Sequence, residues 1–178
     1  MTNHVMLDLE TLSTDADALI LSIGATKFNQ VTLEIVDMFH VAIEPRTAAH
    51  LGGKIDPDTV LWWMSPSRDE ARVEWLKNER VDIGTALEGF AMWFGPDSLP
   101  VWGNGASFDN VILRRTYDRA GLPCPWRYTH DRCFRTLKNC APPIEIATDG
   151  VVHDALQDAV HQTRVLKEIA RITNIYLG

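Results

Sequence analysis

The sequence predicts an α/β domain built around a mixed sheet, and three observations lead to this prediction. The first 43 residues contain three strand-like segments joined by short polar turns, which is typical of an antiparallel meander. Later in the chain, short apolar segments alternate with segments of helical period. With 46% hydrophobic and 23% charged residues, the 178-residue chain suits one globular domain over residues 1–178.

The first predicted strand, residues 5–11, carries two acids. Asp8 and Glu10 are two positions apart, so their side chains leave the same face of a strand. Their neighbours are apolar, and two like charges in an apolar strand repel each other and are costly to desolvate. We therefore expect Asp8 and Glu10 to bind a hard divalent cation; the alternative is a solvated pair on an edge strand.

The next elements follow from alternation and turn residues. Two more strands are expected at residues 18–28 and 32–43, joined by a tight turn at residues 29–30. Gly24 indicates a bend or a close backbone approach within the second strand. Residues 45–55 are predicted to form a loop.

Helices are predicted from apolar period, capping residues and the glycines and prolines that end them. Asp56 and Pro57 suit the cap and first position of a helix at 59–64. The other helices are expected at residues 67–76, 82–94, 107–120, 132–140 with Asp131 as cap, and 155–173. Short strands are expected at residues 99–102 and 126–129.

Two later motifs supply further acids. Asp109 lies in the first turn of a helix just past a strand end, where α/β sheets bind ligands. Asp154 and Gln157 resemble a capping box, which leaves His153 outside the helix and Asp158 about one turn inside it. Taken singly, Asp109 could be a first-turn acid favoured by the helix dipole, and His153 a surface histidine.

The acids together predict a magnesium or manganese site. Four carboxylates suit Mg²⁺ or Mn²⁺ rather than zinc, and the three cysteines lack CxxC spacing. Two such ions about 4 Å apart can catalyse phosphoryl transfer. A histidine with a pKa near neutrality can accept the proton of the attacking water.

In order and spacing, these motifs resemble the DEDD-type 3′–5′ exonucleases of the histidine subclass (DEDDh). Residues 8–11 match DxET, residues 104–109 match Asn-x-x-x-Phe-Asp, and residues 153–158 match His-x-x-x-x-Asp. The resemblance spans nearly the whole chain and implies a ribonuclease-H-like fold, in which helices flank a three-strand meander and parallel strands. Residues 58–63, together with residues 70–72, resemble a subgroup of short phage and bacterial exoribonucleases.

The resemblance implies roles for particular residues. The implied metal ligands are Asp8, Glu10, Asp109 and Asp158, and the implied general base is His153. The residues expected to contact substrate are Thr11, Leu12, Trp62, Trp63, Asn104 and Phe108. Adjacent helical residues point about 100° apart, so we expect one tryptophan of the pair to be buried and the other to stack on a base.

The implied activity is release of nucleoside 5′-monophosphates from 3′ ends of single-stranded or short RNA and/or DNA, with two Mg²⁺ or Mn²⁺ ions. The net charge of −7 argues against a broad phosphate-binding surface, so a local basic patch is expected. Candidates are Arg132, Arg135 and Lys138, or Arg114, Arg115 and Arg119, although the second set suits a solvated helix face. His130 and Asp131 could form a second catalytic pair, but a bystander histidine is the simpler interpretation.

Two other function classes remain open from sequence. One is an inactive exonuclease-like module that binds nucleic acid or a polymerase, and the other is a phosphatase or nucleotidase acting on small molecules. No apolar run approaches the ~20 residues that span a bilayer, and no signal peptide is evident, so we expect a cytoplasmic protein with reduced thiols and no membrane partner. The resemblance also implies that two copies can pair as a homodimer.

Overall fold

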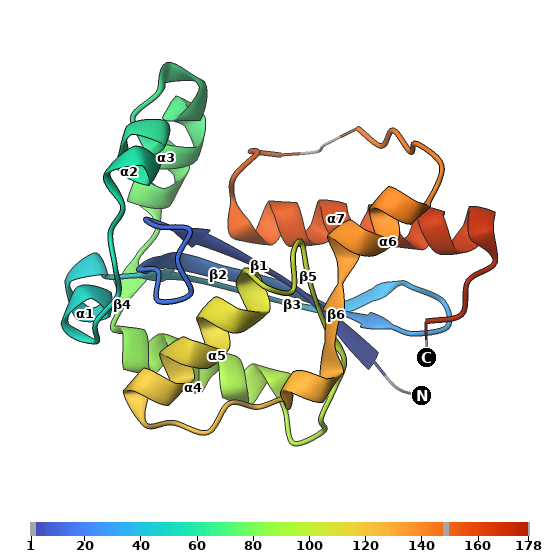
Figure 1. Ribbon diagram of the computed structural model, residues 1–178, viewed down its shortest axis with the longest axis horizontal. Helices are drawn as coiled ribbons and strands as arrows, with labels where there is room; N and C mark the ends of the chain where they lie inside the picture. Colours follow the sequence, from blue (N-terminus) through green and yellow to red (C-terminus); the bar gives the residue numbers. More distant parts are fainter. Residues whose placement is uncertain (1–2, 148–149, 178) are drawn as a thin grey trace.

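The computed structural model describes residues 3–147 and 150–177, and these residues share one six-stranded mixed sheet. The strand order is β4-β3-β2-β1-β5-β6, as Figure 1 shows. The central strand β1 is therefore flanked by an antiparallel neighbour, β2, and a parallel neighbour, β5. This combination of a meander with parallel strands confirms the predicted architecture.

The first three strands are β1 (Asn3–Thr11), β2 (Ile20–Asn29) and β3 (Ile35–Ile43), and they form the predicted antiparallel meander. The turn between β2 and β3 is longer than predicted, so β3 begins later. The Asn29 carboxamide explains this difference, because its Oδ1 accepts a hydrogen bond from the Thr32 amide at 3.0 Å. That bond holds the residues after Asn29 in a turn instead of a strand.

Three short parallel strands extend the meander: β4 (Arg80–Val81), β5 (Val101–Gly103) and β6 (Asp131–Cys133). The two-residue strand β4 was not predicted, because it is too short to carry a period. The strand predicted at 126–129 is wrong, since a 3₁₀ turn, η2 (Tyr128–His130), leads directly into β6.

Asp131 requires a second correction, because it starts β6 and does not cap the helix that follows. Its Oδ1 accepts hydrogen bonds from Asn110 Nδ2 at 3.0 Å and from Trp126 Nε1 at 2.8 Å. Its Oδ2 accepts one from Arg114 at 2.7 Å. The carboxylate thus ties β6 to the preceding helix, and the next helix begins without a side-chain cap.

The helices are α1 (Pro45–His50), α2 (Pro57–Trp63), α3 (Asp69–Lys77), α4 (Ile83–Phe94), α5 (Asp109–Ala120), α6 (Phe134–Cys140) and α7 (Ala155–Thr173), with a 3₁₀ turn, η1 (Pro66–Arg68), before α3. Helix α1 lies in the segment predicted as a loop, and that prediction is wrong. Pro45 occupies the first helical turn, where its fixed φ favours a helix. The predicted cap of α2 is confirmed, because Asp56 accepts a hydrogen bond from the Thr59 amide.

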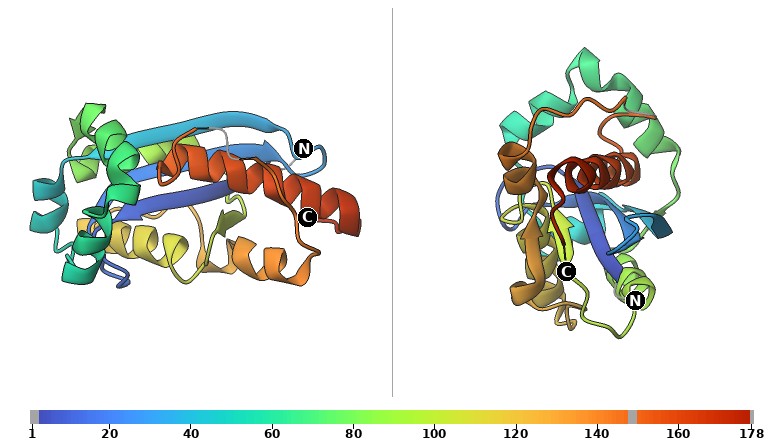
Figure 2. Two further views of the ribbon diagram at one scale, coloured as in Figure 1. Left: turned by 90° about the horizontal axis from the view of Figure 1, so that it is seen from above. Right: turned by 90° about the vertical axis from the view of Figure 1, so that its right-hand side faces the viewer.

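Two hydrophobic cores lie on opposite faces of the sheet. One contains Val5, Leu7 and Leu9 of β1 together with α4 and α5, and the other contains Met6 together with α6 and α7. Figure 2 shows α7 along one face and α4 behind the other. Helices α2 and α3 stand apart at the end of the sheet, beside the N-terminal end of α7 (Figure 1). None of the helices within the described residues combines the length and apolar content needed to cross a bilayer.

Candidate active site

Strand β1 directs its two acids to the face of the sheet that α7 covers. Leu7 and Leu9 enter the core with α4 and α5, so the alternating positions of Asp8 and Glu10 point the other way. Both acids are buried, with 9% and 8% of their surface exposed. The expectation that the pair shares one face is therefore confirmed, and the solvated edge-strand alternative is wrong because β1 is central in the sheet.

Helix α7 brings the third motif onto this face at its N-terminal end. Gly24 lies opposite Asp8 in the ladder, and a Cβ added there would lie 2.1 Å from the Ala155 carbonyl carbon. The expected close approach at Gly24 is thus confirmed, and it allows the start of α7 to pack directly on β2. Asp154 caps α7 as predicted, since its Oδ1 accepts a hydrogen bond from the Gln157 amide at 2.9 Å.

His153 lies just before α7 in a left-handed conformation, with φ of 67°. Its backbone N–H donates a hydrogen bond to Asp158 Oδ2 at 3.2 Å. Its imidazole packs edge-on against the Trp62 ring, with 4.9 Å between centroids. Burial, followed by the charge of Arg68, lowers the pKa of His153 below its ordinary value.

Asp109 begins α5 and is buried against β1. The Leu9 amide of β1 donates a hydrogen bond to Asp109 Oδ1 at 3.2 Å. The other oxygen, Oδ2, is buried and has no hydrogen-bond partner among the described residues. Gly103, which ends β5, is needed here, because a Cβ at that position would lie 2.3 Å from Asn110 Oδ1.

These segments enclose one cavity of about 200 Å³ beside β1. It is lined by Asp8, Leu9, Glu10, Asn104, Phe108, Asp109, Arg135, His153, Asp158 and Gln162. We call it the acid cavity. All five residues to which the sequence assigns catalysis line it, although they come from three segments that are distant along the chain.

The four carboxyls of the acid cavity resist ionising together. Burial, then the like charges of the neighbouring acids, raises the pKa of both Asp8 and Glu10 well above their ordinary values. Burial raises the pKa of Asp109 to about 7 and that of Asp158 to about 6. A divalent cation would offset this cost and would give the unpaired Asp109 Oδ2 a partner.

One subset of the acid cavity has the spacing of a metal site. Ligand atoms of Glu10, His153 and Asp158 all lie within 4.8 Å of one another. Asp8 and Asp109 line the same cavity outside this tight group. The donor set is dominated by carboxylate oxygens, which fits a hard divalent cation.

A second hollow of about 530 Å³ adjoins the acid cavity and shares Leu9, Glu10 and Phe108 with it. We call it the side hollow. Its remaining lining residues are Thr11, Thr14, Asp56, Asp58, Thr59, Trp62 and Trp63. The hollow thus lies between the end of β1 and α2, directly beside the acids.

The structure distributes the six expected substrate contacts unevenly. Thr11, Trp62 and Trp63 line the side hollow, Asn104 lines the acid cavity and Phe108 lines both, whereas Leu12 lines neither. Leu12 instead lines an apolar hollow of about 220 Å³ beside α3. As expected for the tryptophan pair, one ring is buried: Trp63 is 7% exposed and Trp62 is 40% exposed. Trp63 Nε1 donates a hydrogen bond to the Thr11 carbonyl at 2.9 Å.

Three further residues act on the acids, and two of them, Gln162 and Arg68, belong to none of the sequence motifs. Gln162 Nε2 donates a hydrogen bond to Asp8 Oδ1 at 2.7 Å. Its position four residues after Asp158, on the same face of α7, is a signal that could have identified it. The positive charge of Arg68 of η1 adds to the lowering of the His153 pKa by burial, and it offsets part of the rise in the Glu10 pKa. Arg135, a member of one expected basic patch, lines the acid cavity and donates a hydrogen bond to the Asn104 carbonyl at 2.5 Å.

The other candidate basic residues lie outside the two hollows. Arg115 and Arg119 both pair with Asp17, at 2.7 and 2.9 Å, and Arg114 pairs with Asp131. Neither Arg132 nor Lys138 is among the described residues that line either hollow. His130 is also remote from the acids, and its Nδ1 lies 2.8 Å from Ser98 Oγ.

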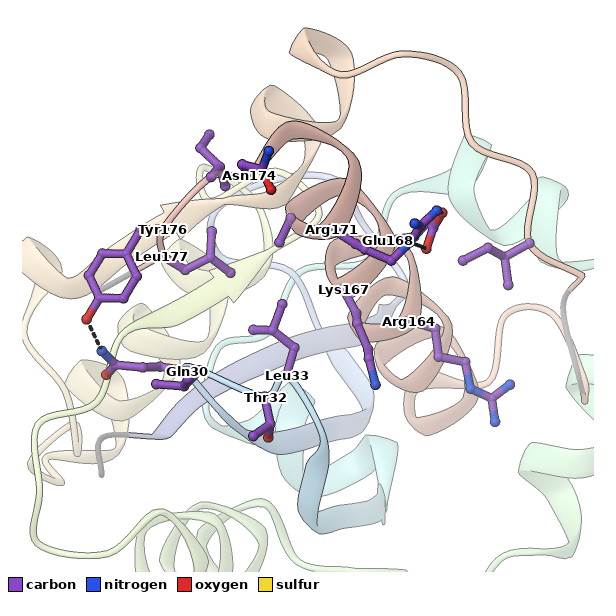
Figure 3. A pocket seen from close by; sticks show the side chains of 14 residues that line it. Gln30, Thr32, Leu33, Arg164, Lys167, Glu168, Arg171, Asn174, Tyr176 and Leu177 are labelled. Atoms are coloured by element: carbon purple, nitrogen blue, oxygen red, sulfur yellow. Dashed lines mark hydrogen bonds and ion pairs between the residues drawn. The ribbon is translucent and has the colours of Figure 1, made fainter.

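A further hollow of about 540 Å³ lies at the C-terminal end of α7 (Figure 3). The Gln30 side chain donates a hydrogen bond to the Tyr176 hydroxyl at 2.9 Å, which joins the β2–β3 turn to the C-terminal segment. The basic side chains there include Lys167, paired with Glu34, and Arg171, paired with Glu168. Those charges are balanced within the fold, and none of the five acid-cavity residues predicted to be catalytic lines this hollow.

Comparison with known proteins gives the chain a family. Residues 3–170 match the family described as the 3′-5′ exoribonuclease Rv2179c-like domain. The chain belongs to this family. No curated protein sequence matches it.

Solved structures with a similar fold include exonuclease I of E. coli in complex with a dT13 oligonucleotide, with a TM-score of 0.69 and 14% identity over 98% of this chain. The chain spans 43% of that protein's length. The nuclease domain of 3′hExo, a DEDDh family member bound to rAMP, has a TM-score of 0.64 and 13% identity, with coverage of 96% of this chain and 92% of that one. The Exonuclease I of Methylocaldum szegediense has a TM-score of 0.67 and 16% identity, covering 96% of this chain and 41% of that one. These likenesses confirm the fold that the resemblance implied, and the family match confirms the identification as a 3′–5′ exonuclease.

Proposed function

We propose that the chain is a metal-dependent 3′–5′ exonuclease that releases nucleoside 5′-monophosphates from 3′ ends of single-stranded or short RNA and/or DNA. The observation that carries this proposal is the convergence of Asp8, Glu10, Asp109, His153 and Asp158 on one 200 Å³ cavity. Their chemistry suits hydrolysis of a phosphodiester, because carboxylates hold hard cations and a neutral imidazole accepts a proton.

The four carboxylates would hold Mg²⁺ or Mn²⁺, and two ions are the expected number. Bound there, such cations would lower the pKa of water and stabilise negative charge on phosphate. The chain's own groups supply the remaining steps. Gln162 orients Asp8 through its hydrogen bond, and the Leu9 amide orients Asp109. His153 Nδ1 or Nε2, neutral at pH 7, accepts the proton of the attacking water.

The side hollow is the proposed site of the terminal nucleoside, because it opens directly beside Glu10 and carries an exposed aromatic ring. Stacking of a base on Trp62 would contribute about 1–3 kcal/mol. Phe108, which lines both hollows, would lie between the nucleoside and the phosphate that is cleaved. The family description supports RNA as the first substrate to test, and the oligonucleotide complex of exonuclease I supports single strands.

The test is digestion of a 5′-labelled RNA oligonucleotide, and of the matched DNA, with Mg²⁺ or Mn²⁺. Wild type should produce a ladder that shortens from the 3′ end, and Asp8→Ala should lose at least about 1,000-fold in rate, because a cation ligand contributes several kcal/mol. The control variant Asp97→Ala removes an exposed acid and should retain wild-type activity.

Three outcomes would contradict the proposal. Equal rates for wild type and Asp8→Ala would show that the acid cavity is not the site of hydrolysis. Faster turnover of mononucleotides than of oligonucleotides would indicate a nucleotidase. Binding of oligonucleotides without turnover of any of them would indicate an inactive binding module.

A further inference from the structure

The segment from α2 to α3, residues 57–77, forms an arm beside the N-terminal end of α7 (Figure 1). Two of its side chains reach the active site. Trp62 packs against the imidazole of His153, and Arg68 lies close enough to Glu10 and His153 to affect both electrostatically. The arm is therefore part of the wall around the reacting groups.

The guanidinium of Arg68 is held by an aromatic ring. Its Cζ lies 4.2 Å from the centroid of the Trp62 ring, which is the geometry of a cation–π contact. The same ring contacts His153, so Trp62 joins the arginine to the proposed general base. Trp62 lines the side hollow together with Glu10, so this arrangement fixes a positive charge behind the wall of that hollow, although Arg68 itself lines neither hollow.

Arg68 uses little of its hydrogen-bonding capacity, because it donates one long bond, from Nη1 to the Ser67 carbonyl at 3.4 Å. Within residues 3–147 and 150–177, Arg68 makes no ion pair, and its buried Nε has no hydrogen-bond partner. Arg72 on the same arm is the contrast, because it donates to the Ser65 carbonyl at 3.0 Å and pairs with Asp69. A buried N–H without a partner is costly, and within the described residues Nη2 makes no hydrogen bond either. Because Arg68 is only partly buried, an acceptor from outside the chain can meet the Nη side of the guanidinium.

We propose that Arg68 binds the phosphodiester group that is cleaved, and that Trp62 holds the guanidinium in position for this contact. The proposal rests on the proposed exonuclease function and names a further catalytic residue for it. Trp62 contacts His153 and lines the side hollow with Glu10, so the guanidinium on its ring is placed to turn toward a non-bridging oxygen of a phosphate bound beside these groups. The planar fork of arginine donors suits two such oxygens and would stabilise the charge that develops on them.

Arg135 does not take this role in our proposal. Its guanidinium donates to the Asn104 carbonyl and lies against Gly105, so it supports the loop that precedes Asp109. The charge of Arg135 also lowers the pKa of Asp109, although burial of that carboxyl outweighs the effect. Arg135 is thus engaged at the loop before Asp109 through a short hydrogen bond, whereas the only hydrogen bond of Arg68 within the described residues is the long one from its Nη1 to the Ser67 carbonyl, at 3.4 Å.

The experiment compares Arg68→Ala with Lys77→Ala, which removes a positive charge from an exposed site on the same arm. On an RNA oligonucleotide with a 3′-hydroxyl, Arg68→Ala should lower kcat about 100-fold, the typical cost of removing one donor to developing charge. Lys77→Ala should stay within about twofold of wild type. Calorimetry should show that Arg68→Ala binds Mn²⁺ as tightly as wild type or more tightly. The substitution removes a positive charge that repels a cation held by Glu10.

Three further measurements separate a phosphate contact from structural support. Free guanidinium ion added to Arg68→Ala should restore part of kcat and should not accelerate Lys77→Ala. Affinity for the same oligonucleotide with Ca²⁺, measured by fluorescence anisotropy, should fall about tenfold in Arg68→Ala. Arg68→Lys should have an intermediate kcat, because it keeps the charge and loses the fork.

The proposal is overturned if wild type cleaves RNA and Arg68→Ala keeps kcat within about threefold of it. It is also overturned if Arg68→Ala loses Mn²⁺ binding and guanidinium restores nothing, because the arginine would then only support the fold. If wild type cleaves no oligonucleotide, the proposed function fails, and the affinity measurement alone decides the phosphate contact: equal affinity in wild type and Arg68→Ala overturns it.

Discussion

His153 is held by both its backbone and its ring. A φ of 67° is uncommon outside glycine, and such conformations persist where the surroundings enforce them. The hydrogen bond to Asp158 and the contact with Trp62 supply that enforcement. The imidazole therefore enters the acid cavity from a defined direction, as a proton acceptor in catalysis requires.

The pH dependence of kcat should report this residue. Only neutral imidazole accepts a proton, and burial and Arg68 hold the pKa of His153 below its ordinary value. We therefore expect kcat to stay level as pH falls from 8 to 7 and to decline only below the usual histidine pKa. His153→Ala should lose about 100-fold or more in kcat and keep Mn²⁺ binding. Its kcat should not show the decline that the titration of His153 causes in wild type. A His153→Ala rate equal to wild type from pH 6 to 9 would contradict the assignment.

Sequence could predict those site residues whose side chains would destabilise the fold unless they served a function. Asp8 and Glu10 stand out because two acids interrupt an apolar strand, and this conflict is visible in the sequence itself. Gln162 and Arg68 are different, because an amide on a helix or an arginine in a turn suits solvent equally well. The spacing of Gln162 from Asp158 signals only a shared helix face, and the contacts that Gln162 and Arg68 make depend on where α7 and the arm are packed.

Among the elements, the position of α7 depends on a glycine, because any side chain at residue 24 would collide with the start of this helix. Gly24 lies on β2 beneath the first turn of α7, and a Cβ there would lie 2.1 to 2.3 Å from backbone atoms of Ala155 and Leu156. Backbone atoms cannot rotate away, so the helix would have to move. Because Asp158 and the cap at Asp154 start that helix, Gly24 sets the distance between the third motif and β1.

Gly24→Ala should therefore damage the site. We expect a loss of about 1–3 kcal/mol in the free energy of unfolding, typical of forced overpacking, together with weaker Mn²⁺ binding and a lower kcat. Gly89→Ala is the matched control, because its added Cβ would meet only the Phe39 ring at 3.9 Å and would stabilise α4 by about 0.5–1 kcal/mol. Denaturant unfolding and calorimetry measure both variants. Unchanged Mn²⁺ affinity in Gly24→Ala would contradict the argument.

Sequence predicted the long elements of the fold better than the short ones. The meander, α4 and α7 carry several turns or alternations each, so their period is readable. Strands β4 and β6 are two and three residues long and exist only because the sheet offers them a neighbour. The prediction of Asp131 as a helix cap failed because its partners are set by tertiary packing. They are Asn110 on α5 and Trp126, which sequence does not place beside it.

For the whole molecule, the acid cavity concentrates charge in a protein that is already acidic. Four carboxyls share about 200 Å³ while the chain has a net charge of −7. The folded state therefore holds protons more tightly on these groups than the unfolded state does, unless cations are present. Stability, pH and divalent cations are thereby linked through a single cavity.

The metal-free protein should become less stable as pH rises from about 4 to about 7. The folded pKa of Asp109 is about 7 and that of Asp158 about 6, against an ordinary 3.8, so the stability these groups contribute is present at low pH and lost as pH rises through the folded values. Each kcal/mol lost should lower Tm by about 2–4 °C, and Mg²⁺ or Mn²⁺ should reverse the loss. Asp109→Asn should flatten the pH dependence of Tm, whereas Asp97→Asn, at an exposed position, should not. Parallel Tm curves for wild type and Asp109→Asn, measured with a chelator present, would mean that the buried carboxyl does not couple folding to proton binding.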